Sequence, residues 1–464
     1  MKQDFDAIIV GTGQAGPSLA GRLTQAGWTV AIVERKLFGG TCVNNGCTPT
    51  KAMVASAHAA HLARRGGDFG VIRHEPVTVD MRQVVARKDG IVMKSRTGIE
   101  SWLRNMERCT VFQGTGCFVS PNEIRVGENV LRGKHIFLNV GARPSVPEMP
   151  GVQDVRFLTS TTVLDLNELP RHLIVVGGSY VGLEFAQMYR RFGADVTVVE
   201  RKSRLVPNED EDLSKGVKEI LESEGIQLRL DADCIRLEDR GSDVAVGVDC
   251  LEGHPEVVGS HILLAVGRQP NTDDLGLKAA GIQTDKHGYI TVNDELLTSA
   301  AGVWALGDCN GRGAFTHTSY NDFEIVADNL LDKGSRRVSD RIPVSALYID
   351  PPLAQIGLTE TQVLESGRPA LIGTRPMTKV GRAVEKGESQ GFMKVLVDAE
   401  SKKILGAAIL GTGGDEAIHC ILSTMYANAP FTTLSHAMHI HPTVSELIPT
   451  MLQSMTPLVS KKNS

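Results

Sequence analysis

Long hydrophobic segments are missing from this 464-residue sequence, although 42% of its residues are hydrophobic. No apolar run approaches the roughly 20 residues that a membrane-spanning helix requires. Excess positive charge is missing as well, because 49 Lys and Arg residues are outnumbered by 54 Asp and Glu residues. The basic residues are scattered, whereas nucleic-acid binders carry a basic patch. We therefore expect neither a membrane nor a nucleic acid as a partner.

A signal peptide begins with a positively charged segment that is followed by an apolar one. We expect none here, since residues 1–4 lead directly into a predicted strand. Eight cysteines are spread over the whole length, without the density of a small disulfide-rich secreted domain. No pairs of Cys-x2-Cys metal ligands occur, so we predict no metal site. These patterns predict a cytoplasmic protein of two to four domains.

A dinucleotide-binding fingerprint opens the chain. The apolar segment 5–10, a predicted strand, runs into Gly11, Gly13 and Gly16 and then into a predicted helix, and the next predicted strand ends at Glu34. Glycines at this spacing permit a tight turn and bring backbone N–H groups close to a pyrophosphate, while the acid accepts a hydrogen bond from a ribose hydroxyl. Because strand, helix and acid accompany the glycines, the motif predicts a nucleotide site.

The same unit occurs a second time from residue 172 onward. Its glycines and its acid are Gly177, Gly178, Gly182 and Glu200. In both copies 23 positions separate the first glycine from the acid, so we expect two nucleotide sites. Ser179 stands where the middle glycine is expected, and its side chain leaves less room between the backbone and the second pyrophosphate.

Two cysteines, Cys42 and Cys47, follow the first fingerprint closely. Thiols with four residues between them can close a small disulfide ring, and Gly46 gives the backbone the freedom to coil between them. Pro49 predicts a helix start, whose positive end would lower the pKa of Cys47. The pair resembles a redox-active disulfide beside a flavin. The alternatives are two inert buried thiols or half of a metal site.

Together these features resemble the FAD-dependent pyridine nucleotide-disulfide oxidoreductases, which include dihydrolipoamide dehydrogenase, glutathione reductase, mercuric reductase and a bacterial Cu(II) reductase. The resemblance covers essentially the whole chain. Four further motifs contribute to it: Asn139-Val140-Gly141-Ala142-Arg143-Pro144, Ala265-Val266-Gly267-Arg268-Gln269-Pro270-Asn271, Trp304-Ala305-Leu306-Gly307-Asp308 and His441-Pro442-Thr443-Val444-Ser445-Glu446.

The resemblance implies an α/β fold with two Rossmann-like dinucleotide-binding domains and a C-terminal α+β dimerisation domain. The implied FAD domain is discontinuous and comprises residues 1–145 and 265–338. The NAD(P) domain lies between these segments, at 146–264, and the dimerisation domain spans 339–464. Loops at 144–151 and 267–271 are expected to mark the crossings.

The resemblance also assigns residues to the cofactors. FAD is the implied bound cofactor, and residues that resemble its contacts outside the glycine turn are Gly40, Thr41, Lys51, Gly141 and Asp308. Gly267 is a further implied cofactor-binding residue. Lys51 and Glu184 resemble an ion pair beside the flavin N5, and Tyr180 resembles the ring that covers the nicotinamide pocket until the nucleotide displaces it. Taken singly, these residues could equally be a surface Lys, a capping Glu and a core Tyr.

In the dimerisation domain, His441 and Glu446 match the pair that reaches the Cys pair of the second subunit of a homodimer. A histidine held by a carboxylate is a suitable acid–base group near neutral pH. His436, His439 and His441 could instead form a metal cluster, but no nearby pattern completes a known set of ligands.

The sequence leaves two classes of substrate: a small lipoamide- or glutathione-like disulfide, or a thiol-ligated metal ion. The tail 451–464 has no cysteine, whereas mercuric reductases carry two adjacent cysteines at the C-terminus, so we do not expect mercury reduction. The His-Glu pair indicates a disulfide. The Cu(II) reductase relatives also keep the His-Pro dipeptide, and Pro351-Pro352-Leu353 resembles them.

The residues near the second fingerprint suit both NADH and NADPH. Glu200 suits the free ribose hydroxyl of NADH, whereas Arg201, with Arg204 nearby, suits the 2′-phosphate of NADPH. We expect NADPH, with NADH possible. Two rival functions are a flavoprotein NAD(P)H oxidase or quinone reductase with a vestigial Cys pair, and a non-catalytic scaffold that docks into a larger complex.

Overall fold

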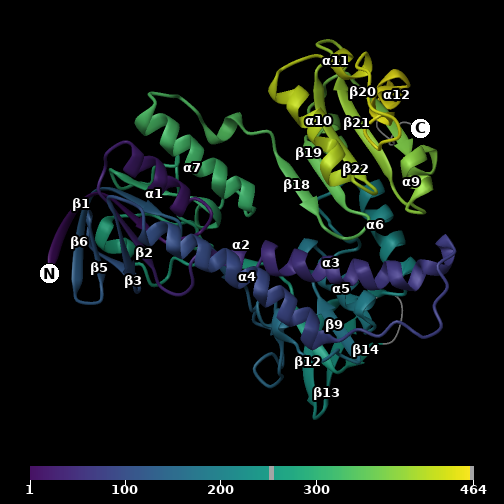
Figure 1. Ribbon diagram of the computed structural model, residues 1–464, viewed down its shortest axis with the longest axis horizontal. Helices are drawn as coiled ribbons and strands as arrows, with labels where there is room; N and C mark the ends of the chain where they lie inside the picture. The colour runs from purple at the N-terminus through teal and green to yellow at the C-terminus, as the bar shows by residue number, and fades with distance from the viewer. Residues whose placement is uncertain (250–254, 460–464) are drawn as a thin grey trace.

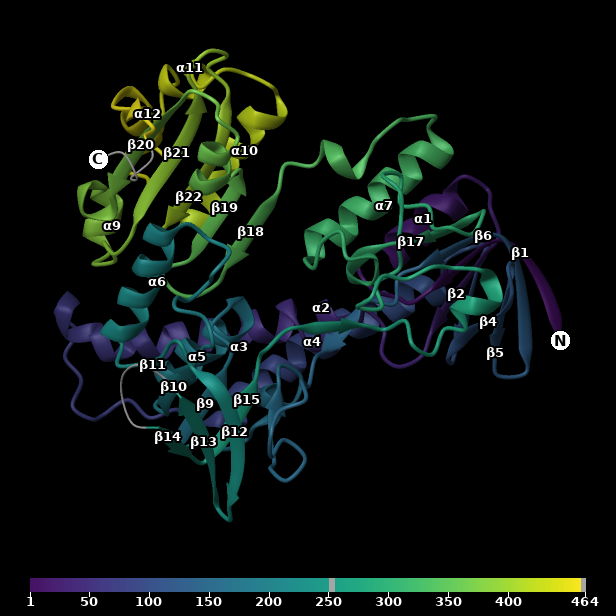
Figure 2. The ribbon, with the colours of Figure 1, turned by 180° about the vertical axis from the view of Figure 1, so that it is seen from behind.

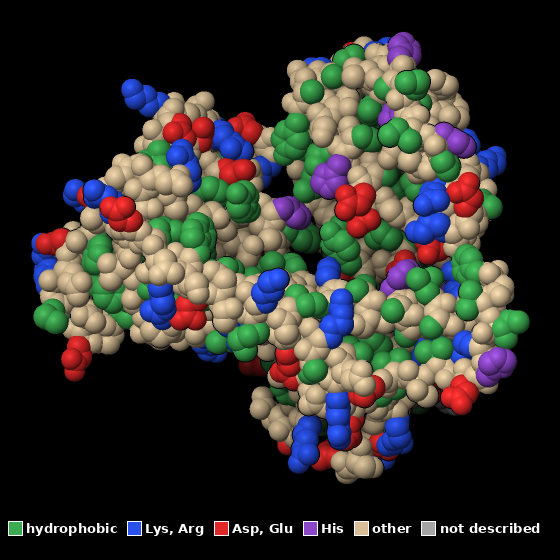
Figure 3. Space-filling view, viewed as in Figure 1, with side chains coloured by type: hydrophobic (Ala, Val, Ile, Leu, Met, Phe, Trp, Pro, Cys, Tyr) green, Lys and Arg blue, Asp and Glu red, His purple; other side chains and the backbone are tan. Residues whose placement is uncertain are grey.

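The computed structural model describes residues 1–249 and 255–459. Three parts are visible in Figure 1: one around α1 (Gly16–Gln25) and α7 (Thr316–Leu331), one around β9 (His172–Val176), and one around β21 (Phe392–Asp398). The space-filling view in Figure 3 shows the surface hollowed where these parts meet. The three parts have the α/β and α+β character that the sequence predicts.

The first part is built on a mostly parallel sheet. Its strands run in the order β3-β2-β1-β6-β5-β4, with β17 beside β6. They are β1 (Lys2–Val10), β2 (Val30–Glu34), β3 (Cys109–Gln113), β4 (Gly116–Ser120), β5 (Glu123–Val126), β6 (Asn129–Leu138) and β17 (Val303–Ala305). Residues 7–10 and 30–34 are buried because helices cover the sheet, which explains why both segments read as continuous apolar runs.

Three helices lead from this sheet toward the second part. They are α2 (Gly40–Asn44), α3 (Cys47–Arg64) and α4 (Met81–Arg104). The side chain of Asp80 caps the N-terminus of α4 by accepting hydrogen bonds from the amides of Arg82 and Gln83. Helix α3 packs against both α4 and α5 (Tyr180–Phe192), so it joins the first two parts of the molecule (Figure 1).

The second part repeats the parallel arrangement, with strand order β11-β10-β9-β15-β8. The partners of β9 in this sheet are β8 (Leu158–Thr159), β10 (Asp195–Val199), β11 (Gln227–Arg229) and β15 (His261–Leu264), and α6 (Glu211–Ser223) follows β10. An antiparallel sheet of β12 (Asp233–Arg240), β13 (Asp243–Asp249) and β14 (Glu256–Gly259) lies beside it. The predicted second strand–turn–helix unit is therefore confirmed.

The two crossings between the first two parts differ from each other. Residues 145–151 form a loop, as expected for 144–151. The prediction of a loop at 267–271 was wrong, because residues 268–270 form β16 and pair antiparallel with β7 (Ala142–Pro144), which satisfies the backbone groups of both segments. The exact domain bounds given above stay predictions.

The C-terminal part is a six-stranded antiparallel sheet with helices packed on it (Figure 2). Its strands besides β21 are β18 (Val344–Leu347), β19 (Leu353–Gly357), β20 (Ala370–Pro376), β22 (Ile404–Leu410) and β23 (Thr456–Pro457). Its helices are α8 (Glu360–Glu365), α9 (Gly381–Glu385), α10 (Gly414–Tyr426), α11 (Thr432–Ser435) and α12 (Leu447–Gln453). One hydrophobic core contains Val175 and Phe185 of the second part together with Leu353 and Leu410 of this one, which holds the two parts together.

Within the described ranges, none of the helices is long and apolar enough to cross a membrane.

Candidate active site

The two glycine turns have the same geometry. A Cβ on Gly11 would lie 2.3 Å from the carbonyl oxygen of Asn139, and one on Gly177 would lie 2.4 Å from that of Ala265. Both residues also have positive φ angles, of 103° and 115°. In each copy the turn therefore presses against the segment that follows the neighbouring strand, and only glycine fits.

Glu34 and Glu200 each accept hydrogen bonds from their own glycine turn. Glu34 accepts hydrogen bonds from the amide and the hydroxyl of Thr12, at 3.0 and 2.6 Å. Glu200 accepts one from the amide of Gly178, at 2.6 Å, and another from the amide of Lys202, at 2.7 Å. An ionised carboxylate has about four acceptor positions, so both acids keep room for a ribose hydroxyl. Their predicted contact with ribose stays a prediction.

The first turn fits a pyrophosphate. Among the described residues, the amides of Gly13, Gln14 and Ala15 find no hydrogen-bond acceptor, and they precede the N-terminus of α1. Free amides and a positive helix end together bind phosphate groups. The Asn139 side chain holds this turn, because it accepts from the amide of Gly16 at 3.1 Å and donates to the carbonyl of Leu306 at 3.0 Å.

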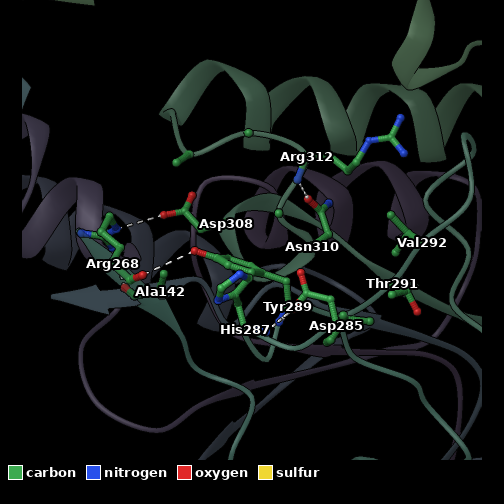
Figure 4. Close-up of a pocket in the computed structure, with 14 residues that line it drawn as sticks. Ala142, Arg268, Asp285, His287, Tyr289, Thr291, Val292, Asp308, Asn310 and Arg312 are labelled. Atoms are coloured by element: carbon green, nitrogen blue, oxygen red, sulfur yellow. Dashed lines mark hydrogen bonds and ion pairs between the residues drawn. The ribbon is translucent and has the colours of Figure 1, made fainter. Parts of the chain in front are cut away.

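Asp308 lines a cavity of about 530 Å³. Figure 4 shows its carboxylate directed toward Arg268, whose Nε lies 3.4 Å away, with Tyr289 beside them. Burial raises the pKa of Asp308, while the positive charge of Arg268 opposes this effect. The Nε of Arg268 is buried and has no hydrogen-bond partner in the described chain. The residues at this position therefore offer both an acceptor and a donor to the polar chain of a dinucleotide such as FAD.

Cys42 lies in α2 and Cys47 is the first residue of α3, and both thiols are free. The hydrogen bond from Cys42, the hydroxyl of Thr316 and the positive charge of Lys51 lower the pKa of Cys47 to about 6, although burial acts in the opposite direction. Its Sγ lies 3.2 Å from the Oγ1 of Thr316. The same hydrogen bond and burial raise the pKa of Cys42. At neutral pH Cys47 is therefore the thiolate of the pair.

Lys51 and Glu184 form the predicted ion pair. The Nζ of Lys51 lies 2.6 Å from Oε2 of Glu184, across the contact between α3 and α5. The second oxygen of Glu184 accepts the amide of Tyr348 at 3.0 Å, and Lys51 also lies 4.5 Å from the centre of the Tyr348 ring. This arrangement fixes the ammonium one helical turn after Cys47. Its predicted place beside a flavin stays a prediction.

Tyr180 contacts residues from all three parts of the molecule. Its hydroxyl donates to Oε1 of Glu209 at 2.6 Å and lies 3.1 Å from Oγ of Ser345 in β18. Its ring lies 6.2 Å from that of Phe315, the residue immediately before Thr316. The ring predicted to cover the nicotinamide pocket is thus close to the segment that touches Cys47.

His441 and Glu446 also form a pair. The Nδ1 of His441 lies 2.8 Å from Oε2 of Glu446, and 80% of the His441 side chain is exposed. Within the described residues, His436, His439 and His441 do not come together as a set of metal ligands. The group of Asp210, Asp212 and Glu360 could hold a cation, but the ammonium of Lys394 already lies between them.

The residues expected to select the nucleotide lie at the end of β10. Arg201 is exposed. Arg204 donates instead to the carbonyl of Pro207 at 2.8 Å, so its guanidinium is partly committed within the chain. The roles of Glu200 and Arg201 toward the nucleotide stay predictions.

Comparisons with known proteins agree with this geometry. A model of the pyridine nucleotide-disulphide oxidoreductases matches residues 5–322, and a model of that family's dimerisation domain matches residues 343–452. The chain belongs to this family. Its members are flavoprotein oxidoreductases that use FAD and NAD(P)H, so the chain is an NAD(P)H-dependent oxidoreductase with an FAD cofactor and a dimerisation domain.

Relatives with different activities are similar along almost the whole chain. The probable pyridine nucleotide-disulfide oxidoreductase RclA of Escherichia coli is 35% identical over 451 residues, which cover 95% of this chain and 97% of RclA. Mitochondrial dihydrolipoyl dehydrogenase of Pisum sativum is 33% identical, with 96% and 90% covered. Mercuric reductase of Staphylococcus aureus is 32% identical, with 90% and 76% covered.

A solved structure, the Cu(II) complex of the HOCl-induced flavoprotein disulfide reductase RclA from Escherichia coli, matches with a TM-score of 0.89 and 33% identity. The match covers 97% of this chain and 99% of that one. The likeness to the fold of the flavoprotein disulfide reductases thus extends over 97% of this chain.

Several residues near the site were not predicted to act there. They are Thr316, Phe315, Tyr348, Ser345 and Glu209. No short motif marks them, and they reach the site through contacts between segments far apart in the sequence. Asn139 was found within a motif, but its role in holding the glycine turn becomes visible only in the structure.

Proposed function

We propose that this protein reduces a small disulfide with electrons from NADPH, through FAD and the Cys42–Cys47 pair. The observation that carries the proposal is the thiol pair itself. Cys47 begins a helix, has a pKa near 6 and lies beside Thr316. Two inert core thiols would have neither a lowered pKa nor an exposed sulfur.

The chain's own residues would hold the two nucleotides. The free amides after Gly11, together with Glu34 and Asp308, would bind FAD, and the second turn with Glu200 would bind NADPH. When bound, FAD would supply the transfer of an electron pair from NADPH to the Cys42–Cys47 disulfide. Tyr180 would cover the nicotinamide pocket in the absence of nucleotide, and the Lys51–Glu184 pair would supply a fixed positive charge beside the flavin.

The thiols then act in sequence. Cys42 attacks one sulfur of the substrate disulfide, which forms a mixed disulfide and releases one thiol. Cys47, as the thiolate, attacks Cys42 in this mixed disulfide, releases the second thiol and restores the Cys42–Cys47 disulfide. In total, NADPH, one proton and one disulfide give NADP⁺ and two thiols.

A base is needed because the pKa of Cys42 is raised. We assign this role to His441 of the partner subunit, with Glu446 holding its Nδ1 so that Nε2 faces the thiol. The imidazole takes the proton of Cys42 and gives it to the departing thiolate. The exposure of His441 in the single chain is what a residue that reaches into a second subunit requires.

A thiol-ligated metal ion is a second candidate substrate. It is supported by the likeness to RclA, which has a solved Cu(II) complex. In such a reaction the reduced Cys pair would bind the ion and transfer electrons to it, and the His441–Glu446 pair would not be needed to protonate a leaving sulfur.

The test compares steady-state turnover of Cys42→Ser, Cys47→Ser and the control Cys117→Ser with NADPH. The acceptors are lipoamide, glutathione disulfide, cystine, Cu(II) and a quinone. Our proposal predicts that both active-site variants lose disulfide reduction while the control keeps it. Full disulfide turnover by Cys42→Ser would contradict the proposal, and quinone turnover that survives blocking of the reduced thiols would favour the oxidase instead.

A further inference from the structure

The hydroxyl of Tyr180 joins three separate segments of the chain. Tyr180 itself is the first residue of α5, Glu209 lies in the loop before α6, and Ser345 lies in β18 of the C-terminal part. The hydroxyl donates to Glu209 at 2.6 Å and lies 3.1 Å from Ser345. A tyrosine that merely packed in a core would not need two polar partners from different parts of the molecule.

Glu209 is an unusual partner, since only 8% of its surface is exposed. Its Oε1 accepts the hydrogen bond from Tyr180, whereas its Oε2 is buried and has no partner among the described residues. Burial raises the pKa of Glu209, and the hydrogen bond from Tyr180 opposes this. In the part of the chain that the structure describes, Tyr180 is therefore the one side chain that donates a hydrogen bond to the carboxylate of Glu209.

The neighbouring residue fixes Glu209 in place. Asp210 accepts hydrogen bonds from the amides of Glu360 and Thr361, at 2.9 and 3.2 Å, and pairs with Lys394 at 2.9 Å. These contacts anchor the loop to α8 and β21 of the C-terminal part. The backbone beside Glu209 is therefore held in place independently of Tyr180.

We propose that Glu209 and Ser345 are positioning residues that hold Tyr180 closed and so set the free-energy cost of admitting the nicotinamide ring of NADPH. This inference rests on the proposed function, in which Tyr180 covers the nicotinamide pocket. Opening breaks a hydrogen bond to a buried carboxylate, and that cost lowers the fraction of molecules competent to bind. Apparent affinity for the nucleotide is reduced by the same fraction.

The test measures binding by calorimetry, using FAD-loaded protein and the tetrahydro analogue of NADPH, which cannot donate hydride. The fragment 2′-phospho-ADP-ribose, which lacks nicotinamide, is the control ligand because it does not displace Tyr180. We expect Glu209→Ala to lower the Kd of the analogue by about tenfold and Ser345→Ala to lower it by about threefold, and Tyr180→Phe, which loses both contacts, to lower it at least as much as Glu209→Ala. The Kd of the fragment is expected to stay within about twofold of the unaltered protein, which also shows that the variants fold.

Two further comparisons separate holding Tyr180 from a general structural effect. Glu209→Gln keeps an acceptor for the tyrosine hydroxyl, so its Kd for the analogue should stay within about twofold of the unaltered protein. The double variant Tyr180→Phe with Glu209→Ala should bind no more tightly than Tyr180→Phe alone, since that variant has already lost the hydrogen bond to Glu209.

Additive effects, or equal changes for analogue and fragment, would overturn the inference. If Glu209→Ala and Tyr180→Phe bind the analogue with unchanged affinity, the positioning role of Glu209 and Ser345 is wrong, whereas the proposed function still stands. Failure of the unaltered protein to bind the analogue at all would overturn both.

Discussion

The sulfur of Cys47 lies 3.2 Å from the hydroxyl oxygen of Thr316, at the first turn of α7. Residues 47 and 316 belong to segments separated by most of the chain, yet the N-termini of two helices, α3 and α7, meet at this sulfur. A hydroxyl donor and two positive helix ends favour the thiolate over the thiol. Thr316 thus contributes to the low pKa of Cys47, along with Cys42 and Lys51.

The first prediction concerns the pH dependence of this thiolate. With a pKa of about 6, Cys47 is charged at neutral pH and becomes protonated as the pH falls below 6. Thr316→Ala removes a hydrogen-bond donor to the thiolate, so the pKa of Cys47 rises. As the pH is lowered, Cys47 then becomes protonated at a higher pH than in the unaltered protein. Thiolate absorbance of the reduced protein, titrated with pH, measures this, and Thr316→Ser is the matched control. An unchanged midpoint in Thr316→Ala would show that the hydroxyl does not stabilise the thiolate.

A second prediction concerns stability. The side chain of Lys394 is only 2% exposed and lies 2.9 Å from Asp210, 2.8 Å from Asp212 and 3.2 Å from Glu360. Lys394→Met leaves these carboxylates together without a cation, which we expect to cost about 3 kcal/mol of unfolding free energy. Denaturant unfolding of the FAD-loaded protein checks this. Lys215→Met, at an exposed i,i+4 pair, is the control and should cost less than about 0.5 kcal/mol. Equal loss in both variants would contradict the importance of the cluster.

A third prediction follows from a site shared between subunits. Cys42→Ser and His441→Ala should each lower disulfide turnover of the homodimer by at least about 100-fold. In a mixed dimer, however, one site combines an intact Cys pair with an intact His441. Random mixing of the two variants should restore about a quarter of the original turnover. No recovery in purified mixed dimers would place both groups of the site in one subunit.

The fourth prediction concerns the choice of nucleotide. Arg201 is exposed at the end of β10, and an arginine pairs well with a phosphate. Arg201→Ala should therefore raise the KM for NADPH about tenfold and change the KM for NADH by less than about twofold. Steady-state kinetics with both nucleotides decide this, with Arg204→Ala as the comparison because Arg204 donates to Pro207. A KM for NADH equal to or below that for NADPH in the unaltered protein would reverse the assignment.

The repeated fingerprint could be predicted from the sequence because its physics is local. A strand, a glycine turn and an acid at fixed spacing dictate one compact unit, and β1, α1 and β2 occur where expected. The Lys51–Glu184 and His441–Glu446 pairs could be predicted only through the family resemblance, since nothing local connects residues 51 and 184. Both pairs are present in the structure.

What could not be predicted depends on contacts between distant segments. Thr316 reaches Cys47, and Glu209 and Ser345 reach Tyr180, only through contacts between separate segments of the chain. The pairing of β7 with β16 was missed for the same reason, because each strand is three residues long and is stabilised mainly by the other. Such short segments carry no periodic signal.

An anaerobic titration of the FAD-loaded protein with NADPH, and separately with NADH, followed by its visible spectrum, decides whether the flavin and the Cys42–Cys47 pair exchange electrons. The account predicts a long-wavelength absorption band after two electrons, from charge transfer between the Cys47 thiolate and the flavin, and it predicts loss of this band in Cys47→Ser. Direct bleaching of the flavin in the unaltered protein, without such a band, would contradict redox contact between the flavin and the Cys42–Cys47 pair.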